Sequence, residues 1–194
     1  MQTTNEQNIT PKKAKAPFTK GVLEQVELVV IFFAIVILLF SFVCKTCMVD
    51  GDSMLNTLHD KERVIIWNLF YTPQYEDIVV IHDNGNLKKP IVKRVIGLPG
   101  DTVEIEQLPT TMKVTVTHSD GTSRVLEEDY IYYDTSRYSY LNETYVVGEG
   151  QVFVMGDNRL NSLDSRAEGC YDSRQILGKV VFRMLPLDKI GTVE

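Results

Sequence analysis

The chain has 194 residues, of which 44% are hydrophobic and 24% charged, and this suits one domain of ordinary size with a short appendage. The formal net charge is −6, and because the first 45 residues carry five basic and three acidic groups, the remainder has a net charge of −8. Nucleic-acid binding needs clustered Lys and Arg, so we expect no nucleic-acid partner for so acidic a body.

The N-terminal region combines a polar tail with an apolar run. Residues 1–20 are polar and include two prolines, which predicts a disordered tail. The 17 residues from Leu28 to Cys44 carry no charge and would span about 25 Å as a helix, and extension back to Gly21 gives about 36 Å. Because a bilayer core is about 30 Å thick, we predict a single transmembrane anchor over residues 21–44.

A cleaved signal peptide is the alternative interpretation of this region. The run is long for a signal peptide and no A-x-A sequence follows it, which favours a retained anchor. Four lysines precede the helix, whereas only Lys45 directly follows it. The positive-inside rule therefore predicts a cytoplasmic N-terminus, with residues 45–194 on the outer face.

Beyond residue 45 the pattern changes to short runs rich in β-branched residues, separated by turn-forming pairs such as Asn84-Gly85 and Pro99-Gly100. No second run is long enough to span a membrane. We predict a mostly β fold, in which packed antiparallel sheets form a compact body after the N-terminal transmembrane helix. The predicted strands are Val64–Trp67, Asp77–Ile81, Ile91–Gly97, Thr102–Ile105, Lys113–Thr117, Val152–Met155 and Lys179–Met184.

The three cysteines are Cys44, Cys47 and Cys170. Cys44 and Cys47 have CxxC spacing, but neither a second CxxC nor nearby histidine ligands accompany them, so we predict no metal site. An odd number of cysteines in an exported domain does not indicate a disulfide framework. We expect no cofactor.

Ser53 is a candidate nucleophile, because it lies in a Gly-Asp-Ser-Met sequence just beyond the anchor and glycine lets backbone N–H groups approach a substrate. A serine nucleophile needs a base. The three histidines, His59, His82 and His118, occur in no Ser-His-Asp-like motif. By pattern alone, Ser53 could equally be an ordinary surface serine.

Lysine is the other known base for serine, provided that burial lowers its pKa far enough for the neutral form to exist near pH 7. Only the predicted strand Ile91–Gly97 places lysine within an apolar run. Alternation puts Lys93 on one face and Arg94 on the other, and it does not say which faces inward. Chemistry favours Lys93, since arginine stays protonated in proteins. An edge strand with two solvated cations is the alternative.

Three segments together resemble the signature of the bacterial type I signal peptidases, which are Ser-Lys proteases. They are GDSMLNTL at 51–58, KRVIGLPGD at 93–101 and GDNRLNSLDSR at 156–166. DIVV at 77–80 and GKVVFRMLPL at 178–187 support them, and all follow the family's order. The compact body resembles the shorter, Gram-positive members, although the region from about 106 to 145 is not covered.

The resemblance implies a membrane-anchored serine endopeptidase that removes signal peptides from exported preproteins after a small-x-small motif, through an acyl-enzyme. Ser53 would be the nucleophile and Lys93 the general base, with the Ser53 N–H in the oxyanion hole. Ser162 would hydrogen-bond and orient the lysine ammonium. The resemblance also implies a structural network in which Asp164 pairs with Arg166, Asp157 contributes, and Arg94 holds the sheet rather than the substrate.

Two positions depart from the family's pattern. Some relatives have a serine two residues before the nucleophile as a second oxyanion donor, and this chain has Gly51 there, so a backbone N–H or a water would substitute. Asn56 stands where the family usually has proline, and we expect a modest loosening of the turn.

The resemblance further implies that the substrate adds as an extended strand beside residues 48–50 and Ile91–Val92. Shallow apolar pockets would accept alanine and keep Lys93 desolvated. The predicted substrate-binding residues are Val49, Asp50, Met54, Leu58, Ile91 and Val92.

The expected partners are preprotein signal peptides and the lipid bilayer, with the export machinery as a further candidate, and the expected location is the bacterial cytoplasmic membrane. Two other functions stay open on the residues alone. One is a different Ser-Lys protease, such as a self-cleaving repressor relative, and the other is a membrane-tethered β domain that binds extended peptides without cleaving them.

Overall fold

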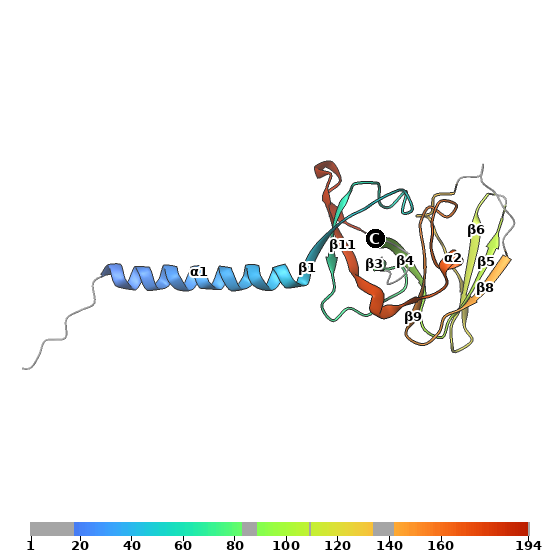
Figure 1. Cartoon of the computed structure of the whole chain (residues 1–194), viewed down its shortest axis with the longest axis horizontal. Helices are drawn as coiled ribbons and strands as arrows, with labels where there is room; N and C mark the ends of the chain where they lie inside the picture. The colour runs from blue at the N-terminus through green and yellow to red at the C-terminus, as the bar shows by residue number, and fades with distance from the viewer. Residues whose placement is uncertain (1–17, 83–88, 109, 134–141, 194) are drawn as a thin grey trace, which may run out of the picture. The chain divides into compact units, whose positions relative to one another are not determined.

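The structure is a computed structural model that describes residues 18–82, 89–108, 110–133 and 142–193 (Figure 1). The predicted tail at residues 1–17 and the Asn84-Gly85 turn lie outside the described residues. The chain divides after Phe42 into two units, a helix and a β body.

The first unit contains one long apolar helix. Helix α1 covers Phe18–Val43, so it begins within the predicted tail, and Cys44 already belongs to a strand. Its window Gly21–Leu38 has a mean hydropathy of 2.4 and none of it is buried. A helix that exposes apolar residues over its whole circumference is stable in lipid rather than in water. Length and composition are therefore those of a membrane-spanning helix.

The β body contains two sheets built from antiparallel pairs. The larger sheet has eight strands in the order β1-β2-β11-β3-β4-β9-β10, with β12 paired to β11, and it curls into a half-barrel (Figure 1). Its strands are β1 Cys44–Met48, β2 Arg63–Trp67, β3 Ile78–Ile81, β4 Ile91–Gly97, β9 Gln151–Met155, β10 Tyr171–Asp172, β11 Ile176–Leu185 and β12 Gly191–Thr192.

The smaller sheet has four strands in the order β7-β6-β5-β8. They are β5 Thr102–Gln107, β6 Met112–Thr117, β7 Ser123–Val125 and β8 Asn142–Val146. Three short helices complete the body: α2 Ser165–Glu168, η2 Ser173–Gln175 and η3 Leu187–Lys189. The mostly β fold after an N-terminal apolar helix is confirmed, and each of the seven predicted strands is present.

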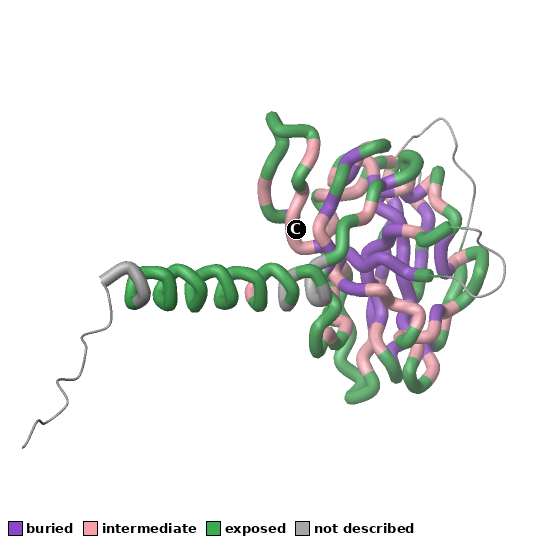
Figure 2. Tube along the Cα trace, turned by 60° about the vertical axis from the view of Figure 1, so that its left-hand side comes forward, coloured by how far each residue is buried: buried purple, intermediate pink, exposed green. Residues whose placement is uncertain are grey.

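Three apolar clusters fill the body, and its buried residues lie along the strands of both sheets (Figure 2). One lies inside the curl of the large sheet and includes Met54, Leu58 and Val92. A second contains buried residues of β4, β9 and the small sheet, such as Ile96, Val103 and Phe153. Strand β4 is buried from Val92 to Gly97, because it is a central strand with packing on both faces. Both Lys93 and Arg94 are consequently buried, which alternation alone did not resolve.

Candidate active site

The candidate nucleophile lies in a tight turn between β1 and β2. Gly51 opens the turn with φ +89°, a conformation that favours glycine. Within the turn, the N–H groups of Thr57 and Leu58 donate to the carbonyl of Met54 at 3.0 and 2.8 Å. The N–H of Asn158 donates to the carbonyl oxygen of Ser53 at 3.0 Å, which joins the turn to the segment after β9. The hydroxyl of Ser53 is thereby presented from a braced backbone.

Lys93 of β4 meets this hydroxyl. Its Nζ donates to Oγ of Ser53 at 2.8 Å and to the carbonyl of Val92 at 3.0 Å. The lysine is 3% exposed. Burial lowers the pKa of Lys93 to about 8, against the opposing influence of the Asp164 and Asp157 carboxylates. A lysine with that pKa has a useful neutral fraction near pH 7, so it can accept a proton from Ser53.

Ser162 approaches the same place from the segment after β9. A Cβ added to Gly156 would fall inside van der Waals contact of both the Ser162 hydroxyl and the Ser53 carbonyl oxygen. The Ser162 hydroxyl is buried and has no hydrogen-bond partner in the part of the chain that the structure describes. Among the described residues it makes no hydrogen bond to Lys93, so its orienting role stays a prediction.

Two buried ion pairs support the turn and the lysine strand. Arg94 Nε and Nη2 donate to the Asp157 carboxylate at 2.9 and 2.8 Å, and the hydroxyl of Thr57 donates to Asp157 at 2.5 Å. Arg166 Nη2 donates to Asp164 at 2.7 Å, and the Gly156 N–H donates to the same oxygen at 2.9 Å. Arg94 is 2% exposed, so its position fits a role in holding the sheet.

The two departures from the family's pattern have distinct geometries. The N–H of Gly51 donates to Asp60 Oδ1 at 2.9 Å in this structure, and its role as a second oxyanion donor stays a prediction. The Ser53 N–H has no acceptor among the described residues. Asn56 has φ +30° and its side-chain amide donates to the carbonyl of Ile131 at 3.0 Å. Proline, whose φ is fixed near −65°, cannot adopt that backbone.

A cleft of about 40 Å³ lies directly beside the Ser53–Lys93 pair. Residues from the end of β1 and the start of β4 form its walls: Met48, Val49, Asp50, Ser53, Pro90, Ile91, Val92 and Lys93. Four of the predicted substrate-binding residues therefore line it. Met54 and Leu58 are not among its lining residues, and both are fully buried in the adjoining apolar cluster. Their predicted place in the substrate pockets stays a prediction, because they share one buried apolar cluster with the cleft residues Val49 and Val92.

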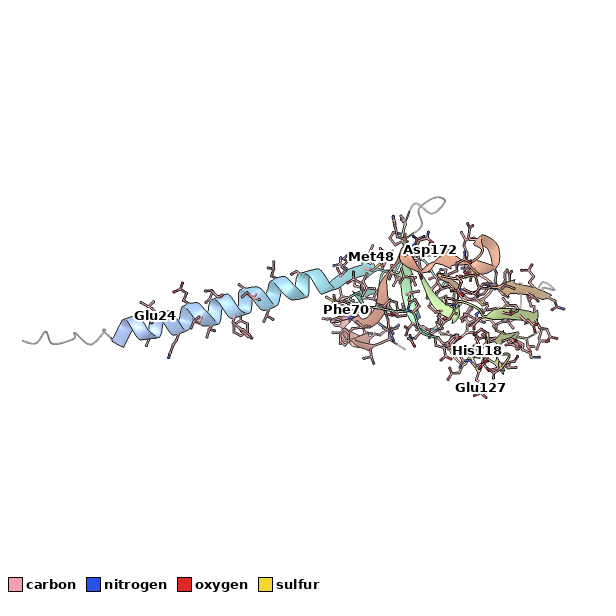
Figure 3. All side chains as sticks on the ribbon, turned by 90° about the horizontal axis from the view of Figure 1, so that it is seen from below. Glu24, Met48, Phe70, His118, Glu127 and Asp172 are labelled. Atoms are coloured by element: carbon pink, nitrogen blue, oxygen red, sulfur yellow. The ribbon has the colours of Figure 1, made fainter. Side chains whose placement is uncertain are left out.

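None of the three histidines contacts Ser53. His118 directly follows β6 of the small sheet, its Nδ1 pairs with Asp101 at 3.1 Å, and it lies apart from Met48 of the cleft (Figure 3). His59 lies 3.6 Å from Glu62. Among the described residues, no cluster of three or more His, Cys, Asp or Glu side chains could hold a metal ion.

Residues that the sequence analysis did not single out also support the turn. The side-chain amide of Asn158 donates to the Asp52 carbonyl at 3.0 Å. Arg159 Nη1 donates to Glu128 at 2.7 Å, and the ring of Tyr130 lies 3.9 Å from the guanidinium of Arg94. Asn158 and Arg159 lie within the third motif, which was the available signal. Nothing in the pattern around Glu128 and Tyr130 predicted their place beneath the site.

Comparisons with known proteins find relatives that match most of the chain. The family model described as signal peptidase, peptidase S26, matches residues 22–185. A probable signal peptidase I-1 of Synechocystis is 34% identical, over 87% of this chain and 85% of its own length. Signal peptidase I S of Bacillus subtilis is 35% identical, over 88% and 93%. Signal peptidase IB of Staphylococcus aureus is 33% identical, over 88% and 93%.

Proposed function

Because the chain belongs to the signal peptidase family, peptidase S26, whose members are serine endopeptidases that cleave signal peptides from exported preproteins, we propose that Ser53 is its nucleophile and Lys93 its general base. Family membership sets aside the self-cleaving repressor relative and the non-enzymatic peptide binder. The observation that carries the assignment is the 2.8 Å contact between the Lys93 ammonium and the Ser53 hydroxyl in a buried setting.

The proposed reaction runs in two halves. Neutral Lys93 accepts the hydroxyl proton while Ser53 Oγ attacks the scissile carbonyl, and the Ser53 N–H donates to the oxyanion that forms. The intermediate collapses to an acyl-enzyme, and Lys93 returns the proton to the leaving amine. A water then attacks the ester with Lys93 again as base, which releases the signal peptide as a carboxylate and restores Ser53.

We propose that the substrate binds as an added strand in the cleft. Strand β9 pairs with β4 only from Arg94 onward, so the edge of β4 at Ile91 and Val92 is open on that side. The backbone N–H and C=O of Val49 are both engaged by residues 61–62, so those of its neighbours Met48 and Asp50 point to the other side, toward the cleft. An extended peptide between these edges would gain hydrogen bonds from both walls.

The size and chemistry of the cleft support a preference for small residues. A cleft volume of about 40 Å³ suits a small side chain. Val49 and Val92 are only 3% and 7% exposed, so together they form a shallow apolar wall. A small-x-small cleavage motif fits these dimensions. An apolar occupant would also exclude water from Lys93 and keep its pKa low.

The apolar helix is consistent with membrane anchoring, and we propose the orientation from charge. The lysine-rich residues 1–20 would face the cytoplasm, residues 21–44 would anchor the chain, and residues 45–194 would form the catalytic domain outside. The loop after β2 offers a site for lipid contact, because Phe70 is 95% exposed and aromatic side chains favour the membrane interface. The export machinery and the bilayer are the partners that this placement favours.

Two substitutions test the proposed function. Ser53→Ala and Lys93→Ala are each expected to abolish cleavage of a preprotein in detergent while the circular dichroism spectrum stays unchanged. Arg174→Ala, which alters an exposed ion pair, is the matched control and is expected to retain activity. A Lys93→Ala enzyme that still cleaves at the wild-type rate would refute the dyad.

A further inference from the structure

Arg183 of β11 links the end of the nucleophile turn to Glu62, whose carbonyl holds Val49 of the cleft wall, and the mechanism above gives it no role. The arginine lies in the segment GKVVFRMLPL and is 16% exposed. Its Nη2 donates to the carbonyl oxygen of Thr57 at 3.1 Å, and its Nη1 donates to Glu62 Oε1 at 3.1 Å. One planar guanidinium therefore holds two segments at a fixed separation.

The first segment is the end of the nucleophile turn. Thr57 is held through its side chain and its carbonyl, since its hydroxyl donates to Asp157 and its carbonyl accepts from Arg183. At the other end of the turn, Asn158 holds the carbonyls of Asp52 and Ser53. The turn itself contains Asn56 at φ +30°, an uncommon conformation that persists only where the surroundings enforce it. Arg183 is one of these enforcing contacts.

The second segment belongs to the cleft wall. Glu62 is 3% exposed, and its carbonyl accepts from the N–H of Val49 at 2.9 Å. Val49 lines the cleft beside Ser53. A shift of Glu62 would therefore move the wall against which an extended substrate docks. Lys189 also lies 3.8 Å from Glu62 but makes no contact with Thr57, so Arg183 alone among the described cations connects the two segments.

We propose that Arg183 is a positioning residue, which sets the distance between the Ser53 hydroxyl and a peptide bound against Val49. The proposal rests on the proposed function, because it takes Ser53 as the nucleophile and the neighbouring cleft as the substrate site. Arg183 itself does not line the cleft. Its loss is expected to lower kcat rather than to raise KM, because a misplaced nucleophile weakens the reacting geometry more than ground-state binding.

The test separates positioning from folding by a pair of variants. Arg183→Met removes the bridge but leaves the Glu62 carboxylate buried without its closest cation, so both Tm and kcat are expected to fall. Arg183→Met/Glu62→Gln removes the stranded charge, so Tm should recover while the Thr57 carbonyl still lacks its donor. We expect kcat about tenfold below wild type in this double variant, with KM changed less than about threefold. The midpoint of the pH profile should stay where it is in the wild type, because Lys93 is untouched.

A double variant with wild-type kcat would overturn the positioning role. If the double variant does not fold, Arg183→Lys decides the question. It keeps a cation near Glu62, but a single ammonium cannot bond both Glu62 and the Thr57 carbonyl as the guanidinium does. We expect a normal Tm with a several-fold lower kcat, and a wild-type kcat would refute the proposal. Lys189→Gln is the control and should match the wild type in kcat. Ser53→Ala, assayed in parallel, tests the proposed function separately, since cleavage by that variant would refute the nucleophile whatever Arg183 does.

Discussion

Gly156 packs so closely against the carbonyl oxygen of Ser53 that no side chain fits between them. The same glycine also touches the hydroxyl of Ser162, so an added methyl group would meet both residues at once. One obstacle is backbone at the nucleophile itself, which cannot rotate away as a flexible side chain can. We therefore expect Gly156→Ala to displace Ser53 from Lys93 and lower kcat by about 100-fold.

The control for that prediction is Gly191→Ala, because nothing lies within 4 Å of the position where its Cβ would be. Cleavage of a preprotein by the two variants, at matched folded concentration, is the measurement. Equal activity of the Gly156→Ala and Gly191→Ala variants would show that the close packing against Ser53 does not affect cleavage.

Asn56 provides a second prediction, because its backbone excludes the residue that relatives usually carry there. Proline cannot take φ +30°, and the Asn56 side-chain bond to Ile131 would also be lost. We expect Asn56→Pro to destabilise the body by about 1–3 kcal/mol, and Asn56→Gly, which tolerates positive φ, to cost less. Urea denaturation of the three proteins measures this order. A proline variant as stable as the wild type would contradict the observed turn.

Asp164 provides a third prediction, through its charge. Burial lowers the pKa of Lys93, and Asp164 is the strongest influence that opposes the shift, whereas Arg166 lowers the pKa further. We expect Asp164→Asn to lower the pKa of Lys93, so that activity rises at a lower pH than in the wild type. The double variant Asp164→Asn/Arg166→Met avoids a stranded arginine and should shift the same way, but less. A shift toward higher pH in the double variant would exclude this electrostatic coupling.

The buried lysine is also expected to cost stability. The pKa of Lys93 is lowered in the folded state relative to the ordinary 10.5, so the unfolded chain binds the extra proton and folding is penalised below about pH 8. Lys93→Met should therefore raise Tm at pH 7 by roughly 5 °C or more, and the gain should shrink as the pH rises toward 10.5. Lys113→Met, at a partly exposed position, is the control. A Lys93→Met protein less stable than the wild type would contradict the penalty.

Sequence patterns predicted the fold class and the strand that carries Lys93, but not every strand of the two sheets. The predicted strand Ile91–Gly97 has the same bounds as β4, because a run of β-branched residues bounded by turn-forming residues favours a strand. Strand β1 was not predicted, because Cys44 continues the apolar run of the helix and no pattern marks where the helix ends. Strand β8 was not predicted either, because its residues are mostly polar and exposed and do not alternate between apolar and polar.

The site residues were likewise predicted only in part. Motif resemblance predicted Ser53, Lys93 and the Asp164–Arg166 pair, because each lies in a segment with a specific pattern. Sequence patterns could not separate pocket from core for Met54 and Leu58, which are buried in the same apolar cluster as the cleft residues Val49 and Val92. The contact between Arg183 and Thr57 spans 126 residues of chain, and no local pattern can predict such a contact.

The most direct test of the Ser53–Lys93 assignment is the pH dependence of kcat/KM for a peptide with a small-x-small cleavage site, measured in detergent. This ratio reports the ionisation of the free enzyme's essential base. Because burial lowers the pKa of Lys93 to about 8, activity should be low at acidic pH and rise with a midpoint near 8 as the ammonium loses its proton. A midpoint near 6.5, which is typical of histidine, or one near 10.4, which is typical of a solvated lysine, would contradict the assignment.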